Sequence, residues 1–432
     1  MNILKHIQIL ILVLFPACLM GMETKTPRYF EFPKPTGEHA VGTRVFYLTD
    51  PSRPEPETKK PRQFLAQAWY PAAGLLDKPT SPYTYEMLKG LKQEMAEKYR
   101  APELTDQLDL IRTYAVTNAP ILSEGQRYPV VIFEHGTRTR RGEYSAVCED
   151  IASHGYVVIM VMHTYLTSFT RFADGSETEV VREHGLLEFI DCINDIEFML
   201  DSAQSGIFGD LTQICDFQNI GIVGHSYGGI MASHICRLNY RVKAGISLDG
   251  PLYGPCAMIP FHKPFMFMIS PTFYETFGDE DGLAFTGITK EEFKRSLETF
   301  CQENGNSYKI ILNNADHNIF SDNAILVDFF KRILGRQDLN FTTGQIDGIK
   351  ATGIIRAYIC SFFDKYLKGQ TSQLLDGQDG RYAEDVTQLA FGGGRHDQPG
   401  MSWKSWAIQW CTYHSLPNWI IRKIFQIYRP YA

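Results

Sequence analysis

The sequence predicts an α/β protein with a mostly parallel, doubly wound sheet, and two observations lead to this fold class. Short runs rich in β-branched and aromatic residues alternate with helix-like stretches along most of the chain, as right-handed strand–helix–strand crossovers require. Several of these runs are continuously apolar, which is typical of parallel strands that helices cover on both faces.

The alternation assigns most of the chain to one catalytic domain, residues 28–390. Its expected strands are Arg44–Leu48, Phe64–Tyr70, Val130–Glu134, Tyr156–Met162, Gly221–Gly224, Ala244–Leu248, Phe265–Ile269 and Tyr308–Leu312. Its expected helices cover about 143–153, 181–203, 228–239, 322–334 and 350–367. Residues 84–118 are interpreted as an inserted helical segment that could act as a lid, and residues 391–432 as a Trp-rich C-terminal extension.

The first 21 residues have the pattern of a signal peptide. Lys5 precedes the apolar stretch Ile7–Phe15, which is too short to span a bilayer. We therefore expect an exported protein, secreted or periplasmic. Two alternatives stay open, namely lipid attachment at Cys18 and a leader retained as an uncleaved anchor.

Composition argues against several classes of function. Lys and Arg number 42 against 49 Asp and Glu, for a net charge of −7, so there is no basic excess to hold nucleic acid. The nine cysteines form no C-x-x-C pair and no H-E-x-x-H motif occurs. We therefore expect no metal and no cofactor, and the sequence leaves disulfide pairing and oligomeric state open.

One motif points to nucleophilic catalysis. Gly224-His225-Ser226-Tyr227-Gly228 has the form G-x-S-x-G, and it follows an apolar strand and precedes a helix. That context is the one in which such a turn presents a serine nucleophile. The alternative is a glycine-rich strand–helix turn with a capping serine.

A serine nucleophile needs a base and a carboxylate that orients the base. In this fold class they follow in the order Ser, Asp, His. Asp249 ends the apolar run AGISLDG, and His317 lies in the polar loop after the strand YKIIL. Asp316 is a rival for the acid, although adjacent side chains rarely form that pairing.

The oxyanion formed on attack needs two backbone N–H donors. The expected donors are the amides of Tyr227, directly after the nucleophile, and Thr137, after the run PVVIFEHG. Four further histidines are interpreted as structural: His135, His154, His163 and His225.

Eight segments together resemble the platelet-activating-factor acetylhydrolase family of the plasma, or isoform II, type. They are GTRVFYLTD, QAWYPA, YPVVIFEHG, EYSAVCEDIASHGYVV, GIVGHSYGG, ISLDGPLYG, NADHNIF and AYICSFFDKYLKG. The resemblance implies an α/β-hydrolase fold and a calcium-independent serine esterase that cleaves short or oxidised sn-2 acyl chains from phospholipids. It places Ser226, Asp249 and His317 on the family's triad, and Thr137 and Tyr227 on its oxyanion donors.

One departure from the family leaves the substrate open. Thr137-Arg138-Thr139-Arg140-Arg141 follows His-Gly, where the family has Leu-Gly and small residues. Arg138 and Arg140 could contact a phosphate or another anion, or they could belong to a solvated loop. The alternatives to a phospholipid esterase are a general carboxylesterase or polyester hydrolase, and an inactive hydrolase fold used for binding.

The C-terminal extension has the composition of a helix that lies in a membrane interface. Trp403, Trp406 and Trp410 would share one helical face, and an aliphatic face opposite basic residues follows Pro417. This pattern predicts contact with a membrane surface. The alternative is that the extension docks on the protein's own surface.

Overall fold

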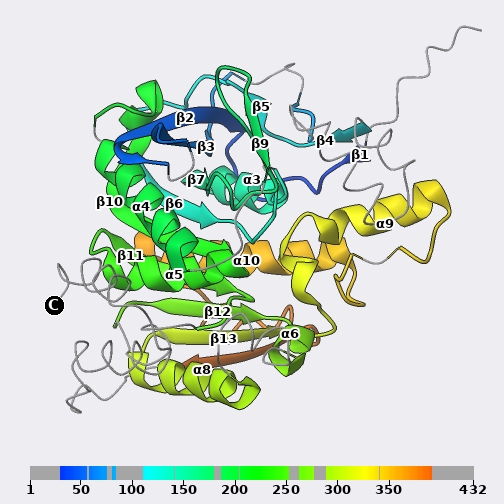
Figure 1. Ribbon diagram of the computed structural model, residues 1–432. Helices are drawn as coiled ribbons and strands as arrows, with labels where there is room; N and C mark the ends of the chain where they lie inside the picture. Colours follow the sequence, from blue (N-terminus) through cyan, green and yellow to red (C-terminus); the bar gives the residue numbers. More distant parts are fainter. Residues whose placement is uncertain are drawn as a thin grey trace, which may run out of the picture.

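The computed structural model describes most of the predicted catalytic domain. The described ranges are 30–55, 58–74, 80–83, 110–140, 142–179, 186–203, 205–252, 262–276, 289–339 and 341–391. A ten-stranded sheet with helices on both faces dominates this part of the chain (Figure 1). The predicted signal peptide, most of the segment 84–118 and nearly all of the C-terminal extension lie outside the described residues.

The secondary structure follows the expected alternation. The strands are β1 (Phe30–Glu31), β2 (Val41–Pro54), β3 (Pro61–Pro71), β4 (Ile111–Arg112), β5 (Val116–Thr117), β6 (Tyr128–Glu134), β7 (Val157–Met162), β8 (Phe169–Arg171), β9 (Glu177–Glu179), β10 (Cys215–His225), β11 (Val242–Leu248), β12 (Phe265–Ile269), β13 (Ser307–Leu312) and β14 (Val386–Phe391). The α-helices are α3 (Ser145–Ser153), α4 (Leu186–Ala203), α5 (Tyr227–Leu238), α6 (Pro271–Thr276), α8 (Lys290–Asn304), α9 (Asn323–Leu334) and α10 (Gly348–Leu367). The described residues also include two short 3-10 helices, η2 (Gly209–Ile214) and η4 (His317–Phe320).

The sheet is parallel in its centre and antiparallel near its edges. Its strand order is β14-β13-β12-β11-β10-β6-β7-β3-β2-β5, and every neighbouring pair from β13 to β7 is parallel. β14 pairs with β13 in the antiparallel direction, as β3 does with β7 and with β2. β6, β7 and β12 are buried at every residue, which accounts for their continuously apolar sequences.

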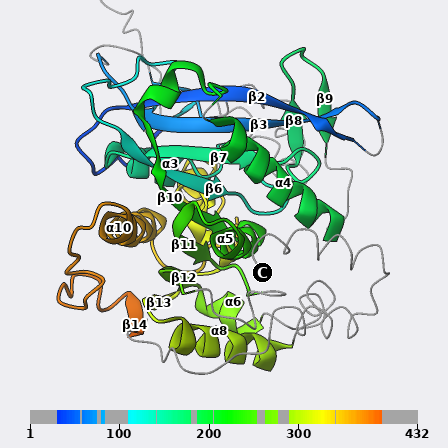
Figure 2. The same ribbon diagram turned by 90° about the vertical axis from the view of Figure 1, so that its left-hand side faces the viewer.

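Two apolar cores lie on opposite faces of this sheet. One core includes side chains of α4, α5 and α8, and the other includes side chains of α3 and α10. Figure 2 shows α10 on one side of the sheet and α4 and α5 on the other. Because the strands are parallel, their carboxyl ends meet at one edge, and that edge is where ligand sites form in such sheets.

The predicted α/β-hydrolase architecture is confirmed, with one local correction. Seven of the eight predicted strands lie within a strand of the large sheet, and the eighth, Tyr156–Met162, begins one residue before β7. Each of the five predicted helices overlaps a helix. Residues 110–118, expected to be helical, instead contain β4 and β5. These strands form because Phe30–Glu31 and Gly42–Thr43 offer unpaired edges that they join, and such pairing overrides local helix propensity.

Six cysteines are free and buried within the described ranges, and each lies on a different element. They are Cys148 on α3, Cys192 on α4, Cys215 on β10, Cys236 on α5, Cys301 on α8 and Cys360 on α10. In the same ranges, no helix combines the length and apolar character that a bilayer-crossing segment needs.

Candidate active site

Ser226 stands on a strained turn between β10 and α5. Its φ and ψ angles are 58° and −120°, and its amide donates to the Leu248 carbonyl at 2.8 Å. A Cβ on Gly224 would lie 2.1 Å from the Gly228 oxygen, and one on Gly228 would lie 2.2 Å from the Glu134 oxygen. Both positions therefore require glycine, and the turn holds Ser226 at the carboxyl end of the central strand.

His317 connects Ser226 to Asp249. Its Nε2 lies 2.9 Å from Ser226 Oγ and its Nδ1 lies 3.2 Å from Asp249 Oδ2. With a proton on Nδ1, the imidazole donates to the carboxylate and its Nε2 accepts from the serine hydroxyl. The structure thus brings together the three residues predicted as nucleophile, base and acid, although they span 91 positions of the chain.

Asp249 is buried and held by neighbouring donors. The amide of Ser270 donates to its Oδ1 at 2.7 Å, and the Ser270 hydroxyl donates to its Oδ2. Burial raises the pKa of Asp249 above its ordinary value, while the bonds from His317 and Ser270 oppose that rise. These bonds fix the carboxylate toward the imidazole.

Asp316, the rival for the acid, has a different role in this geometry. Its Oδ1 accepts the backbone amide of His317 at 2.7 Å, so it caps the short helix η4. It thereby shapes the loop that carries His317, while the imidazole Nδ1 contacts Asp249.

The backbone expected to hold the oxyanion lies beside Ser226. A Cβ placed on Gly136 would be 3.5 Å from Ser226 Cβ, which brings the 136–137 peptide close to the nucleophile. Among the described residues, the Thr137 amide has no hydrogen-bond acceptor. Tyr227 is the first residue of α5, where helix geometry leaves amides without intrahelical acceptors.

The two arginines expected to contact an anion differ in exposure. Arg138 is exposed, with φ of 54° and its amide donating to the Leu166 carbonyl at 3.0 Å. Arg140 is buried, and its Nη1 lies 3.2 Å from Glu143 Oε1. The Arg138 side chain is therefore open to solvent, whereas the Arg140 guanidinium contacts Glu143 within the same loop.

A hydrogen-bonded chain, not predicted from the sequence, links the two loops around Ser226. The Gly136 amide donates to the Tyr144 hydroxyl at 3.1 Å, and that hydroxyl lies 3.0 Å from His225 Nδ1. His225 Nε2 lies 2.9 Å from the carbonyl of His317 and must donate to it, so His225 Nδ1 accepts from Tyr144. Burial lowers the pKa of His225 well below its usual value, which keeps this neutral tautomer.

We expect Tyr144→Phe to lower kcat about tenfold with little change in KM, because it removes an acceptor from Gly136 and a donor from His225, each worth about 1 kcal/mol. Tyr156→Phe is the matched control, since its buried hydroxyl donates to Asp364 Oδ1 at 2.7 Å. The control should lower Tm and leave kcat unchanged. If Tyr144→Phe lowers Tm and leaves kcat unchanged, the hydrogen bonds of Tyr144 do not position the loops around Ser226.

A buried ionic network supports the strand that leads into the oxyanion loop. His163 Nε2 lies 2.9 Å from Glu134 Oε2, and its Nδ1 lies 3.0 Å from Asp195 Oδ2. Arg62 Nη2 donates to the same Asp195 oxygen at 2.7 Å. Burial disfavours the charged form of His163, but Cys192, Glu134 and Asp195 together raise its pKa well above the ordinary value. The network anchors Glu134, two residues before Gly136.

His135 follows Glu134 and stays neutral. Its Nδ1 lies 2.7 Å from the Gly136 carbonyl and donates to it, and its Nε2 accepts the His163 amide at 3.4 Å. Burial lowers the pKa of His135 to about 3. His135, His163 and His225 thus all contact the loops around the site and none of them contacts Ser226 Oγ in the described structure, as expected for structural residues.

Comparisons with known proteins agree with this geometry. Residues 27–206 match the family model of platelet-activating factor acetylhydrolase, isoform II. A probable 1-alkyl-2-acetylglycerophosphocholine esterase from Arthroderma benhamiae is 23% identical over 386 residues, which is 85% of this chain and 96% of the relative. The platelet-activating factor acetylhydrolase of Cavia porcellus is 23% identical over 313 residues, 64% of this chain and 67% of the relative. The chain is thus similar to the isoform II platelet-activating factor acetylhydrolases.

A solved structure extends the comparison to the whole fold. The ferulic acid esterase of Streptomyces cinnamoneus superposes with a TM-score of 0.67 at 26% identity, covering 83% of this chain and 99% of that one. Together with the related acetylhydrolases, this esterase identifies the chain as a carboxylic ester hydrolase. The family match ends at residue 206 and therefore covers the oxyanion loop but not Ser226, so the geometry of the site carries the assignment of the nucleophile.

Proposed function

We propose that the chain hydrolyses esters through an acyl-enzyme on Ser226, and that its substrates are phospholipids with a short or oxidised sn-2 acyl chain. The observation that carries the proposal is the Ser226–His317–Asp249 contact series, with 2.9 Å and 3.2 Å between successive polar atoms. The class of ester is inferred from the similar proteins, a probable 1-alkyl-2-acetylglycerophosphocholine esterase and a platelet-activating factor acetylhydrolase.

The mechanism follows from these contacts. His317 Nε2 removes the Ser226 hydroxyl proton as Oγ attacks the ester carbonyl, and Asp249 stabilises the imidazolium. The amides of Thr137 and Tyr227 donate to the oxyanion of the tetrahedral intermediate. His317 then donates its proton to the departing alcohol oxygen. In the second half, water attacks the acyl-enzyme with His317 again as base, and the acid leaves as Ser226 regains its proton.

The exposed Arg138 favours a phospholipid over a neutral ester. It is adjacent to Thr137, so its guanidinium is tethered close to the proposed oxyanion donor. A guanidinium pairs well with phosphate, and a glycerophospholipid carries its phosphate a few bonds from the sn-2 ester.

Substrate profiling tests the proposal. We expect kcat/KM to be highest for 1-alkyl-2-acetylglycerophosphocholine and to fall steeply for the sn-2 palmitoyl analogue, with p-nitrophenyl acetate hydrolysed less efficiently. Each rate is compared with that of Ser226→Ala to subtract spontaneous hydrolysis. Preference for feruloyl or polyester substrates would instead indicate a general esterase, and no hydrolysis of any ester would indicate a binding protein.

We also propose that the chain is exported and meets its substrate at a membrane surface. Support comes from the sequence of the two ends, a signal-peptide pattern in residues 1–21 and three tryptophans at helical spacing in residues 391–432. Phospholipids are concentrated at such a surface, so surface contact would raise the local concentration of substrate.

A further inference from the structure

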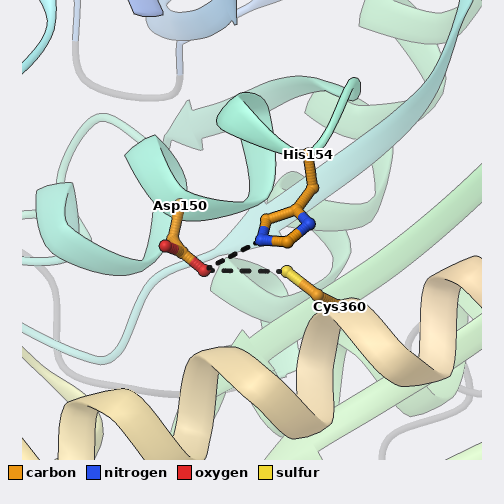
Figure 3. Close-up of side chains that lie close together, drawn as sticks. All are labelled: Asp150, His154 and Cys360. Atoms are coloured by element: carbon orange, nitrogen blue, oxygen red, sulfur yellow. Dashed lines mark hydrogen bonds and ion pairs between the residues drawn. The ribbon is translucent and has the colours of Figure 1, made fainter. Parts of the chain in front are cut away.

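Three side chains of metal-ligand type meet where α3 ends beside α10. Asp150 lies on α3, His154 directly follows that helix, and Cys360 lies on α10 (Figure 3). Asp150 Oδ2 is 3.8 Å from Cys360 Sγ and 3.8 Å from His154 Nε2, and the three atoms all lie within 4.8 Å of one another. The contacts that assemble the active site involve none of the three.

The surrounding contacts leave one carboxylate oxygen directed at the thiol and the imidazole. Asp150 Oδ1 accepts the Thr36 amide at 2.7 Å and faces Arg356 at 3.9 Å. Oδ2 is 3.2 Å from the Thr36 hydroxyl, which also lies 2.8 Å from His154 Nε2. Oδ1 is thus engaged by the Thr36 amide and faces Arg356, whereas Oδ2 is the oxygen that lies nearest the thiol and the imidazole.

Access to the cluster is from one side. Asp150 and Cys360 are buried, whereas 29% of the His154 side chain is exposed. A small cation can therefore reach the cluster past the imidazole, and the buried carboxylate and thiol would close around it.

The spacing fits a small tetrahedral cation. Zinc bonds of about 2.0 Å to nitrogen and oxygen and about 2.3 Å to sulfur put neighbouring ligand atoms about 3.3–3.5 Å apart. The two 3.8 Å separations from Asp150 Oδ2 would have to shorten by about 0.3–0.5 Å. The separation between Cys360 Sγ and His154 Nε2, which is within 4.8 Å, would have to close to a similar value. A mixed sulfur, nitrogen and oxygen set suits Zn²⁺ or Co²⁺ and not Ca²⁺ or Mg²⁺, which prefer oxygen ligands.

We propose that Asp150, His154 and Cys360 form a zinc-binding site that fastens three distant parts of the chain. On binding, the Cys360 S–H bond breaks, its proton passes to solvent and an S–Zn bond forms. The Thr36 hydroxyl, or a water in its place, completes four ligands. The site joins the segment at Thr36 to α3 and α10, and it has no part in ester hydrolysis.

The sequence could not have shown this site by motif. Cys360 is 210 residues from Asp150, and the pair Asp150 and His154 at i, i+4 occurs on many helices for structural reasons. The packing of α10 against α3 brings the third ligand into place.

Cobalt titration of the full chain, stripped of metal with a chelator, tests the proposal. We expect one equivalent of Co²⁺ to bind, with a near-ultraviolet thiolate charge-transfer band and visible bands of tetrahedral intensity. Cys360→Ser should abolish the charge-transfer band, and His154→Asn should weaken binding at least tenfold. Cys148→Ser, which removes the buried thiol of α3 and leaves Cys360 in place, should bind as the wild type does.

Two further measurements separate loss of the site from loss of the fold. Hydrolysis of p-nitrophenyl acetate should persist in all three variants, because none of these residues lies in the catalytic machinery. Zn²⁺ should raise Tm in the wild type and in Cys148→Ser but not in Cys360→Ser. Three outcomes would overturn the proposal. The wild-type chain could fail to bind one equivalent of Co²⁺, or its bound Co²⁺ could show only the weak visible bands of octahedral coordination. The charge-transfer band could also survive in Cys360→Ser.

Discussion

Replacement of Ser226 by alanine should lower kcat by about 10⁴- to 10⁶-fold, because the nucleophile, base and acid act as a unit and the residual rate comes from binding and the oxyanion donors alone. The substitution removes Oγ, the atom that lies 2.9 Å from His317 Nε2. A fluorophosphonate probe should label the wild-type chain once, at Ser226, and should not label Ser226→Ala.

The control for this variant is Ser233→Ala on α5, the helix that follows the Ser226 turn. The Ser233 hydroxyl is buried and donates to the Ile230 carbonyl at 2.8 Å, so its removal perturbs α5 without touching the proposed nucleophile. We expect Ser233→Ala to keep its labelling and nearly all of its kcat. Persistent labelling of Ser226→Ala, located on another serine by peptide mapping, would show that the nucleophile lies elsewhere.

Asp249→Asn should lower kcat by about 10⁴-fold while the protein stays folded. Asparagine can keep the bond from the Ser270 amide through its oxygen, which leaves its NH₂ group to face His317. His317 Nδ1 would then have to accept, and the proton would move to Nε2, where it blocks removal of the Ser226 proton. Part of the activity should return at high pH, where hydroxide can replace the base.

Asp316→Asn distinguishes the two candidate acids. Its side-chain oxygen can still accept the His317 amide, so the cap of η4 survives and kcat should stay within a few-fold of wild type. A fully active Asp249→Asn together with an inactive Asp316→Asn would reverse the assignment. Thermal unfolding of both variants shows whether either loss of activity reflects loss of structure.

Much of the fold and of the site could be predicted because the sequence patterns that specify them lie within short segments of the chain. The buried parallel strands read as continuous apolar runs, and Gly224, Ser226 and Gly228 lie within five positions at a turn whose geometry demands them. Asp249 and His317 could be found because chain order and strand ends restrict where an acid and a base can lie.

The features that the sequence did not reveal depend on contacts between distant segments. β4 and β5 have two residues each, and they form where other strands offer an edge. Tyr144 lies 81 positions from His225, and its hydroxyl has a role only because α3 begins beside the Ser226 turn. Arg140 resembles Arg138 in sequence, but Glu143 at i+3 binds it within the loop.

The distribution of the free cysteines gives this chain a built-in set of probes for local opening. Each of the six buried thiols belongs to a different helix or strand, so alkylation of a given cysteine requires its own element to move away from the core. In dilute denaturant, the alkylation rate at each cysteine, resolved by mass spectrometry, would report the opening free energy of that element. Such a map would show whether the helices on the two faces of the sheet detach together or one face at a time. No probe would have to be introduced by mutation.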